Sequence, residues 1–267
     1  MSADFSTKLK EKWQEQKFVC IGLDPYLDKI PNKFKGSISE NIFEFNKFII
    51  DQTSDLVCAY KLNSAFYEAQ GLEGRKALEQ TIKYLRENHP EIVMILDAKR
   101  GDIANTNSGY VKDAFDNLQV DAITVSPYLG KESLKPFLDR NDKGIMVLVK
   151  TSNEGSAEFQ NLEVGGKPLY EVIAEHAKNW NTNNNVSVVV GATYPKELKA
   201  VRDIVGNMPI LIPGVGAQGG SIKEITEAGL DINKEGIIVS SSRGIIFAEN
   251  PREETLKLHQ EIVNSIK

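Results

Sequence analysis

The feature that most restricts how this chain can fold is a short apolar run that recurs eight times along it. Each run is almost continuously apolar and shows little alternation, which is typical of strands buried on both faces of a parallel sheet. The runs are Phe18–Leu23, Val57–Lys61, Ile92–Leu96, Ala122–Val125, Ile145–Val149, Val186–Val190, Ile210–Ile212 and Ile237–Val239. They predict a parallel sheet that is covered by helices.

Amphipathic patterns with helical spacing fill the intervals between the apolar runs. The predicted helices are Ser39–Thr53, Tyr67–Asn88, Thr106–Asn117, Ser133–Arg140, Leu169–Asn181, Pro195–Val205, Ser221–Ala228 and Arg252–Ile266. Strand and helix therefore alternate through a chain of 267 residues. This alternation predicts an α/β fold, a single (β/α)8 TIM barrel, which takes roughly 250 residues.

Two further features complete the predicted organisation. Residues Met1–Gln16 carry Phe5, Leu9 and Trp13 at helical spacing, so we expect an additional N-terminal helix before the first strand. No stretch rich in Pro, Gly or Ser divides the chain, and residues 1–267 are therefore expected to form one catalytic domain.

The charge balance narrows the class of partner. The chain has 32 basic and 37 acidic side chains and a formal net charge of −5, whereas proteins that bind nucleic acids or membrane surfaces usually carry a positive excess. We therefore expect neither a nucleic acid nor a membrane as partner, although a local basic pocket for a small anion is compatible with this balance. No apolar run approaches the ~20 residues that a membrane-spanning helix needs.

The cysteine and histidine positions indicate no metal centre. Cys20 and Cys58 each lie inside an apolar run, so we expect small buried residues of a cytoplasmic protein and not a disulfide or a metal-binding pair. The histidines, His89, His176 and His259, are too scattered for the spacing of a zinc site.

Polar or turn-forming residues follow the end of each apolar run, whereas the starts of the runs have no comparable set. Asp24, Asp97 and Arg243 are among them. In a barrel of parallel strands all carboxyl ends meet at one face, where enzymes of this fold carry their active sites. The sequence therefore predicts a catalytic face at these strand ends.

The densest of these polar groups is Asp97-Ala98-Lys99-Arg100-Gly101-Asp102. Residues two apart in an extended strand share a face, so Asp97 and Lys99 are expected to point together into the barrel mouth. Charges there are costly unless paired, and Lys61 from the neighbouring strand would complete an alternating array with Asp102. Nearby carboxylates would keep Lys99 protonated, which suits a proton donor. An ion-pair network without a catalytic role is the alternative interpretation.

Glycine-rich loops follow the seventh and eighth predicted strands, over residues 213–221 and 240–244. Glycine lets the backbone approach a ligand closely, and N–H groups at the start of a following helix attract anions. Arg243 could add a bidentate clamp. Because the loops after the last two strands are the recurrent phosphate site of this barrel, we expect a phosphate group there.

Two other loop features leave alternatives open. The connection Asn153–Lys167 is long and without clear structure, so it is expected to act as a lid or to be a mobile surface loop. Asp24 closes the first predicted strand, where its carboxylate could accept hydrogen bonds from sugar hydroxyls or could cap a turn.

Taken together, these residues resemble the orotidine 5′-phosphate decarboxylase family over nearly the whole chain. The resemblance rests on Gly22–Pro25, Lys61–Asn63, Leu96–Thr106, Thr151–Asn153, Val190–Thr193, Pro213–Gly220 and Ser242–Gly244. The stretch Asp97–Thr106 is the most specific of them, and its amino-acid sequence resembles that of the subgroup often called type 2. The resemblance implies conversion of orotidine 5′-monophosphate to UMP and carbon dioxide, the last step of de novo pyrimidine synthesis, without a metal or an organic cofactor.

The resemblance also implies a role for individual residues. Lys99 would protonate C6 of the pyrimidine, Asp97 would lie near the substrate carboxylate, and Lys61 would order the array. Asp102, Ile103 and Thr106 would cross into the neighbouring subunit's site. Asp24 would contact the ribose and Ser152 the pyrimidine ring. The residues implied at the phosphate are Gln218, Gly219, Arg243 and Gly244, and Asn63 and Pro213 are implied as further substrate-binding residues. A homodimer with shared sites is therefore implied.

One departure and two rival functions accompany this resemblance. Some members have a longer loop after the seventh strand, whereas residues 214–220 are short here, so the 153–167 loop is expected to take more of the closing role. Metal-dependent sugar-phosphate decarboxylases and hexulose-phosphate synthases share the Asp-x-Lys-x-x-Asp pattern, but they use a carboxylate after the second strand, where this chain has Lys61. A non-catalytic nucleotide-binding barrel would bind UMP without turnover.

Overall fold

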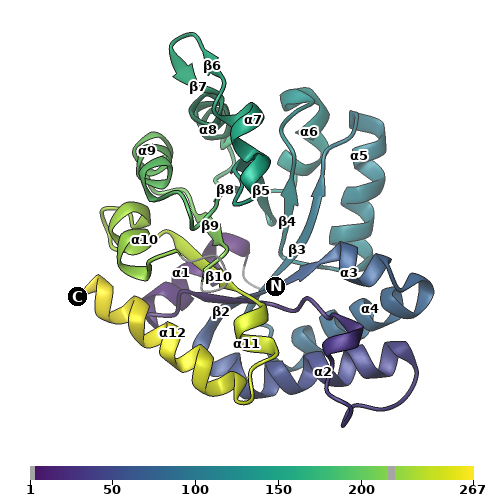
Figure 1. Ribbon diagram of the computed structural model, residues 1–267. Coiled ribbons are helices and arrows are strands. Elements are labelled where there is room, and N and C mark those ends of the chain that lie inside the picture. Colours follow the sequence, from purple (N-terminus) through teal and green to yellow (C-terminus); the bar gives the residue numbers. More distant parts are fainter. Residues whose placement is uncertain (1–3, 216–219) are drawn as a thin grey trace.

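Parallel strands form a closed barrel in the computed structural model, which describes residues 4–215 and 220–267 (Figure 1). The order around the barrel is β1-β10-β9-β8-β5-β4-β3-β2. The strands are β1 (Val19–Gly22), β2 (Val57–Asn63), β3 (Val93–Arg100), β4 (Ala122–Val125), β5 (Gly144–Lys150), β8 (Val186–Val190), β9 (Ile210–Pro213) and β10 (Ile237–Ser241). Each predicted apolar run supplies one strand, so the predicted (β/α)8 barrel is confirmed.

Helices surround the barrel in Figure 1. They are α1 (Phe5–Gln14), α2 (Ile38–Thr53), α3 (Ser64–Glu68), α4 (Gly71–Asn88), α5 (Ala104–Val111), α6 (Gly130–Leu138), α7 (Ala157–Gln160), α8 (Leu169–Trp180), α9 (Pro195–Val205), α10 (Ile222–Gly229), α11 (Arg243–Ile246) and α12 (Pro251–Ile266). Helical turns of 3-10 type cover Leu27–Lys29, Ser54–Leu56 and Glu154–Ser156, and α5 continues into a π-helical turn over Lys112–Asn117.

Two of the predicted helix boundaries are wrong. The continuous helix predicted over Tyr67–Asn88 is divided into α3 and α4, because Gly71, the first residue of α4, adopts a left-handed backbone with φ 58° that interrupts the right-handed helical path. The helix predicted from Thr106 begins earlier, at Ala104, and its second half changes from α to π geometry.

Helix α2 illustrates how local sequence sets an element that supports the barrel. The Ser37 side chain accepts a hydrogen bond from the backbone N–H of Glu40, while the Glu40 carboxylate accepts one from the backbone of Ser37. This reciprocal capping box satisfies N–H groups that have no partner inside the helix. One face of the helix is apolar, and its residues Ile42, Phe45 and Ile49 are buried from solvent.

The predicted N-terminal helix is also confirmed, as α1, and it lies against the amino-terminal ends of the strands. Trp13 donates from Nε1 to the carbonyl of Ile237, at the start of β10, over 2.9 Å. The ring of Phe5 packs so closely on Gly144 that a Cβ there would lie 2.7 Å from it. Helix α1 therefore closes the end of the barrel opposite to the predicted catalytic face.

The segment Asn153–Lys167 has more structure than its sequence indicates. It contains the 3-10 turn, helix α7, and the first part of a two-stranded hairpin of β6 (Glu163–Val164) and β7 (Lys167–Pro168). In Figure 1 the hairpin projects beyond the body of the barrel. The prediction of a connection without clear structure is therefore wrong.

Both cysteines are free and buried, as predicted for small apolar residues. Within residues 4–215 and 220–267, no helix has both the length and the apolar character needed to cross a membrane.

Candidate active site

Three charged side chains meet at the carboxyl ends of β2 and β3. Lys61 Nζ lies 3.3 Å from Asp97 Oδ2, and Lys99 Nζ lies 2.8 Å from Asp97 Oδ1, so one carboxylate is shared by two ammonium groups. The side chains of Lys61 and Asp97 are 7% and 11% exposed, whereas that of Lys99 is 50% exposed. The structure therefore places Lys99 as the member of the cluster that an incoming molecule can reach.

Mutual charge stabilisation keeps the buried members of this cluster ionised. Burial raises the pKa of Asp97, but Lys61 and Lys99 outweigh that effect and lower the pKa to about 2. Burial disfavours the charge of Lys61, but the neighbouring carboxylates of Asp24 and Asp97 outweigh it and raise the pKa above its ordinary value. At neutral pH the site thus holds a carboxylate between cations.

Thr124 is a site residue that the sequence reasoning missed. It lies in β4, is 1% exposed, and donates from Oγ1 to Asp97 Oδ1 over 2.8 Å. Thr124 Oγ1 also accepts a hydrogen bond of 3.0 Å from the backbone N–H of Lys99. The available signal was a single hydroxyl within the apolar run Ala122–Val125, next to the strand that carries the charged cluster.

The backbone at Lys99 is unusual and explains why Thr124 can reach it. Lys99 has a φ of 48°, in the left-handed region that non-glycine residues seldom occupy. The pairing of β3 with β4 shifts register between Leu96 and Arg100, at this same point. The bulge aims the Lys99 side chain at the cavity while its N–H remains hydrogen-bonded to the neighbouring strand.

Two adjoining cavities open at this face and share Lys61, Ser152 and Pro213 in their walls. The first, of about 340 Å³, is also lined by Asp97, Lys99, Thr124, Leu148, Thr151, Asn153, Val189 and Leu211. The second, of about 300 Å³, is also lined by Asp24, Tyr26, Asn63, Phe66, Gly214, Val215, Ser240, Ser241, Ser242 and Arg243. The charged cluster and the pair Asp24 and Arg243 therefore belong to adjoining halves of one hollow.

Asp24 has an unused acceptor in the second cavity. Its Oδ1 atom is buried and has no hydrogen-bond partner among the described residues. Buried polar atoms are normally paired, so an unpaired carboxylate oxygen in a cavity wall suits a ligand with hydroxyl groups. This observation favours the ligand-binding interpretation of Asp24 over the turn cap.

The residues predicted for the phosphate are only partly described. Arg243 is exposed, begins α11 and lines the second cavity. Gly244 lines a different hollow, together with Gly220, Ser221 and Ser241. Gln218 and Gly219 lie outside the described residues.

The structure does not bring Asp102 into the cluster of its own chain. Its Oδ1 accepts a hydrogen bond of 2.6 Å from the N–H of Ile103, and it forms no ion pair within residues 4–215 and 220–267. Asn107 fixes the backbone of Asp102 through hydrogen bonds to its N–H and its carbonyl. Ile103 is 61% exposed and Thr106 is also exposed. The array within one chain therefore has Lys61, Asp97 and Lys99 as members.

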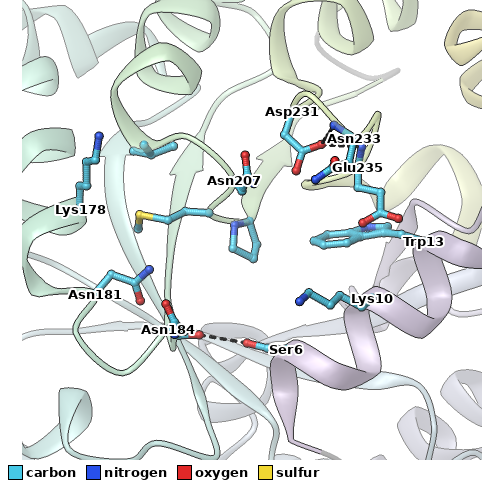
Figure 2. Close-up of a pocket in the computed structure, with 13 residues that line it drawn as sticks. Ser6, Lys10, Trp13, Lys178, Asn181, Asn184, Asn207, Asp231, Asn233 and Glu235 are labelled. Carbon is cyan, nitrogen blue, oxygen red and sulfur yellow. Dashed lines mark hydrogen bonds between the residues drawn. The ribbon is translucent and has the colours of Figure 1, made fainter.

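The cavity of greatest volume among those described lies elsewhere, beside α1, and Figure 2 shows its lining residues. Helix α1 is at the end of the barrel opposite to the charged cluster. The cavity measures about 480 Å³, and Lys10, Trp13, Asn184 and Asp231 are among its lining residues. None of the predicted site residues lines it. The cavity of greatest volume and the charged cluster therefore lie at opposite ends of the barrel.

Comparison with known proteins agrees with this geometry. A protein of Cellvibrio japonicus named orotidine 5′-phosphate decarboxylase is 46% identical over 268 residues, which cover 97% of each chain. A solved structure of Leishmania donovani OMP decarboxylase is 40% identical, with a TM-score of 0.89, and the match covers 98% of this chain and 99% of the other. Leishmania donovani UMP synthase is 42% identical with a TM-score of 0.91, and the match covers 99% of this chain but only 57% of that chain.

The model of the orotidine 5′-phosphate decarboxylase / HUMPS family matches residues 17–258, which include all strands of the barrel and the charged cluster. This chain belongs to the orotidine 5′-phosphate decarboxylase / HUMPS family.

Proposed function

We propose that this protein is a carboxy-lyase that converts orotidine 5′-monophosphate to UMP and carbon dioxide in pyrimidine biosynthesis. The names of its relatives and its family membership support this reaction. The single observation that carries it is the Lys99 ammonium, which is bonded to Asp97 at 2.8 Å and is open to the cavity. A fixed cation at this place can both stabilise developing negative charge and supply a proton.

The two adjoining cavities fit the two ends of such a nucleotide. The pyrimidine would occupy the half with the charged cluster, with Ser152 at the junction in contact with the ring. The ribose would lie in the other half, where Asp24 offers its unpaired Oδ1 to the hydroxyls. The residues assigned to the rest of the nucleotide are Arg243, Gly244, Gln218 and Gly219 at the phosphate, with Asn63 and Pro213 in the cavity wall.

The chemical step needs only a proton beyond the substrate itself. The bond between C6 and the carboxylate carbon breaks, its electron pair remains on C6, and carbon dioxide leaves. Lys99 then gives a proton to C6, which yields UMP and a neutral amine that water reprotonates. Asp97 crowds the substrate carboxylate before it leaves, and the grip on the phosphate supplies binding energy that offsets this repulsion.

A homodimer with shared sites is part of the proposal. Asp102 forms no ion pair with the cluster of its own chain among the described residues, Ile103 and Thr106 are exposed, and the partner subunit's Asp102 would supply the fourth charge of the array. The segments that follow β3, β4 and β5, three neighbouring strands, also expose large apolar side chains. These are Ile103, Tyr128, Leu129, Phe159, Leu162 and Val164. An interface there would remove them from water.

Two other predictions remain as proposals. Residues 1–267 are treated as one catalytic domain, because strands from Val19 to Ser241 close a single barrel and α12 packs on α2. A cytoplasmic location is in keeping with two free, buried cysteines.

The rival within the same family is a metal-dependent decarboxylase or synthase that acts on a sugar phosphate. That chemistry needs a carboxylate ligand after the second strand, where this chain has the Lys61 ammonium, and a cation there repels a metal ion. We therefore favour the metal-independent reaction on a nucleotide.

The first experiment measures the loss of the orotidine absorbance when the purified chain meets orotidine 5′-monophosphate in excess chelator. We expect full activity with the chelator, and Lys99→Ala should reduce kcat at least about a thousandfold, since a general acid is removed. Lys178→Ala, which removes an exposed lysine of α8, serves as the control. UMP binding without turnover by the unaltered chain, or near-normal turnover by Lys99→Ala, would overturn the proposal.

A further inference from the structure

Lys150, the last residue of β5, is a buried cation that the proposed reaction does not use. It is 0% exposed, and no carboxylate of the described residues lies within ion-pair distance of it. Its Nζ instead donates to Asn161 Oδ1 over 2.8 Å and to Ser156 Oγ over 3.1 Å, and it lies 4.5 Å from the centre of the Tyr194 ring. Two hydrogen bonds and one aromatic ring therefore surround the ammonium group.

A bulge in β5 puts Lys150 on the outer side of the barrel wall. Leu148 pairs with Val189, and both line the cavity that holds the charged cluster. The register then shifts, and Lys150 pairs with Val190. Because successive side chains of a strand point to opposite faces, Val190 points away from the cavity and Lys150 points the same way.

Both side chains that accept hydrogen bonds from Lys150 belong to the segment after β5. Ser156 ends the 3-10 turn, and Asn161 follows α7. Thr151, the residue after Lys150, holds the same segment through two further hydrogen bonds. The Gln160 side-chain amide accepts one from Thr151 N and donates one to Thr151 Oγ1, each over 2.9 Å. Residues 154–161 are therefore attached to two successive residues at the exit of β5.

Ser152 follows directly after these two anchored residues. It lines both halves of the cavity, and its backbone packs on Gly191, where an added Cβ would lie 2.7 Å from Ser152 Cα. The position of Ser152 is thus determined on one side by Gly191 and on the other by the anchored segment.

We propose that Lys150 is a positioning residue whose buried ammonium holds residues 154–161 against the barrel and thereby sets Ser152 at the pyrimidine end of the cavity. The inference rests on the proposed function, because Ser152 matters only if a base occupies that end. Lys150 touches no substrate in this arrangement; it acts through Thr151 and Ser152. The cost of burying a charge without a carboxylate partner is offset by the polar and aromatic partners that surround it.

The test compares two ligands that differ in the base. Lys150→Met retains the apolar stem and removes the charge, and its affinity for UMP should fall about tenfold, as expected when a hydrogen bond to the base is misplaced. Its affinity for ribose 5-phosphate, which lacks the base, should remain unchanged. Both are measured by calorimetry on the full chain. Equal loss for the two ligands, or loss for neither, would overturn the inference.

A protease assay tests the anchoring independently of any ligand. Glu154 and Glu158 are exposed in this segment and are not among the apolar side chains assigned to the dimer interface, so a glutamate-specific protease can cut the segment wherever it detaches from the barrel. Lys150→Met should be cut at least about tenfold faster than the unaltered chain, because local opening is easier without the anchor. Unchanged cutting would contradict the inference even if the chain proved not to bind UMP, so this assay separates the inference from the proposed function.

Two further variants keep the test decisive. Asn161→Ala removes one acceptor from an exposed position, so it should fold and show the same changes to a smaller degree, even if Lys150→Met does not fold. Lys178→Met removes a charge from the exposed face of α8 and should behave as the unaltered chain. A response of Lys178→Met equal to that of Lys150→Met would refute a role specific to the buried ammonium.

Discussion

Thr124 connects the carboxylate and the lysine backbone on which the proposed chemistry depends. Its hydroxyl donates to Asp97 and accepts from the N–H of Lys99, whose backbone is left-handed. Such a conformation persists only where surrounding contacts hold it. At the scale of single residues, therefore, the backbone conformation that directs the Lys99 side chain is held by the Thr124 hydroxyl on the neighbouring strand.

Replacing Thr124 by Val should test this connection, because the shape is retained and the hydroxyl is lost. We expect the unfolding free energy to fall by about 1.5–3 kcal/mol, as for a hydrogen bond to a charged group. The value of kcat should fall by about 10- to 100-fold as Lys99 loses its orientation. Thr124→Ser, which retains the hydroxyl, is the control, and denaturant titration with steady-state kinetics gives both numbers. Equal behaviour of the two variants would argue against this role.

The same variant should change the pH dependence of stability. In the native chain Lys61, Lys99 and Thr124 outweigh the effect of burial and lower the pKa of Asp97 from 3.8 to about 2. Stability from this carboxylate is present above pH 3.8 and is lost as the pH falls through about 2. In Thr124→Val the folded pKa moves upward, so the stability difference from the native chain should shrink as the pH falls from about 4 to about 2. A difference that does not change with pH would show that the hydroxyl does not stabilise the charged form.

At the scale of elements, helix α1 closes the barrel through a buried ion pair. Lys8 Nζ lies 2.8 Å from Asp121 Oδ1, and their side chains are 5% and 11% exposed. Asp121 also accepts from the N–H of Met94 at 2.8 Å, so it ties α1 to the start of β3. The helix therefore belongs to the structural end of the barrel, opposite to the charged cluster.

Removing one partner of that pair should be costly. In Lys8→Met the Asp121 carboxylate would stay buried without its cation, and we expect the unfolding free energy to fall by about 3–5 kcal/mol. Lys10→Met, on the exposed side of the same helix, should change it by less than about 0.5 kcal/mol. Urea unfolding measures both, and kcat of the folded Lys8→Met should remain normal. A loss of kcat without a loss of stability would contradict a purely structural role.

At the scale of the whole molecule, the absence of Asp102 from the charged cluster of its own chain, among the described residues, predicts that each site needs two chains. Lys99→Ala and Asp102→Asn chains should each be almost inactive alone. Mixed and re-associated, they should regain up to about a quarter of the native activity per site, because random pairing makes about half of the dimers hybrid and a hybrid holds one site without either change. Turnover of the mixture measures this recovery. If hybrid dimers form, as native mass spectrometry can show, but activity does not return, the shared site is refuted.

The barrel itself could be predicted from the sequence because its signal is repeated and local. Strands buried on both faces must be almost wholly apolar, and eight such runs separated by amphipathic segments are typical of few other folds. The same reasoning placed Asp24, Asp97 and Arg243 at one face, since parallel strands share the direction in which they end. The predicted boundaries of helices were less accurate where the backbone conformation of a single residue sets the boundary, as at Gly71 between α3 and α4.

What the sequence by itself determined is the fold class, the face of the barrel that carries polar chemistry, and the pairing of Lys61 and Lys99 with Asp97. Only the tertiary structure decided that Thr124 hydrogen-bonds to that cluster and that Lys150 lies on the outer side of the barrel wall, bonded to the following segment. The physical reason is register: a one-residue shift between neighbouring strands reverses the face to which a side chain points, and no local pattern records it.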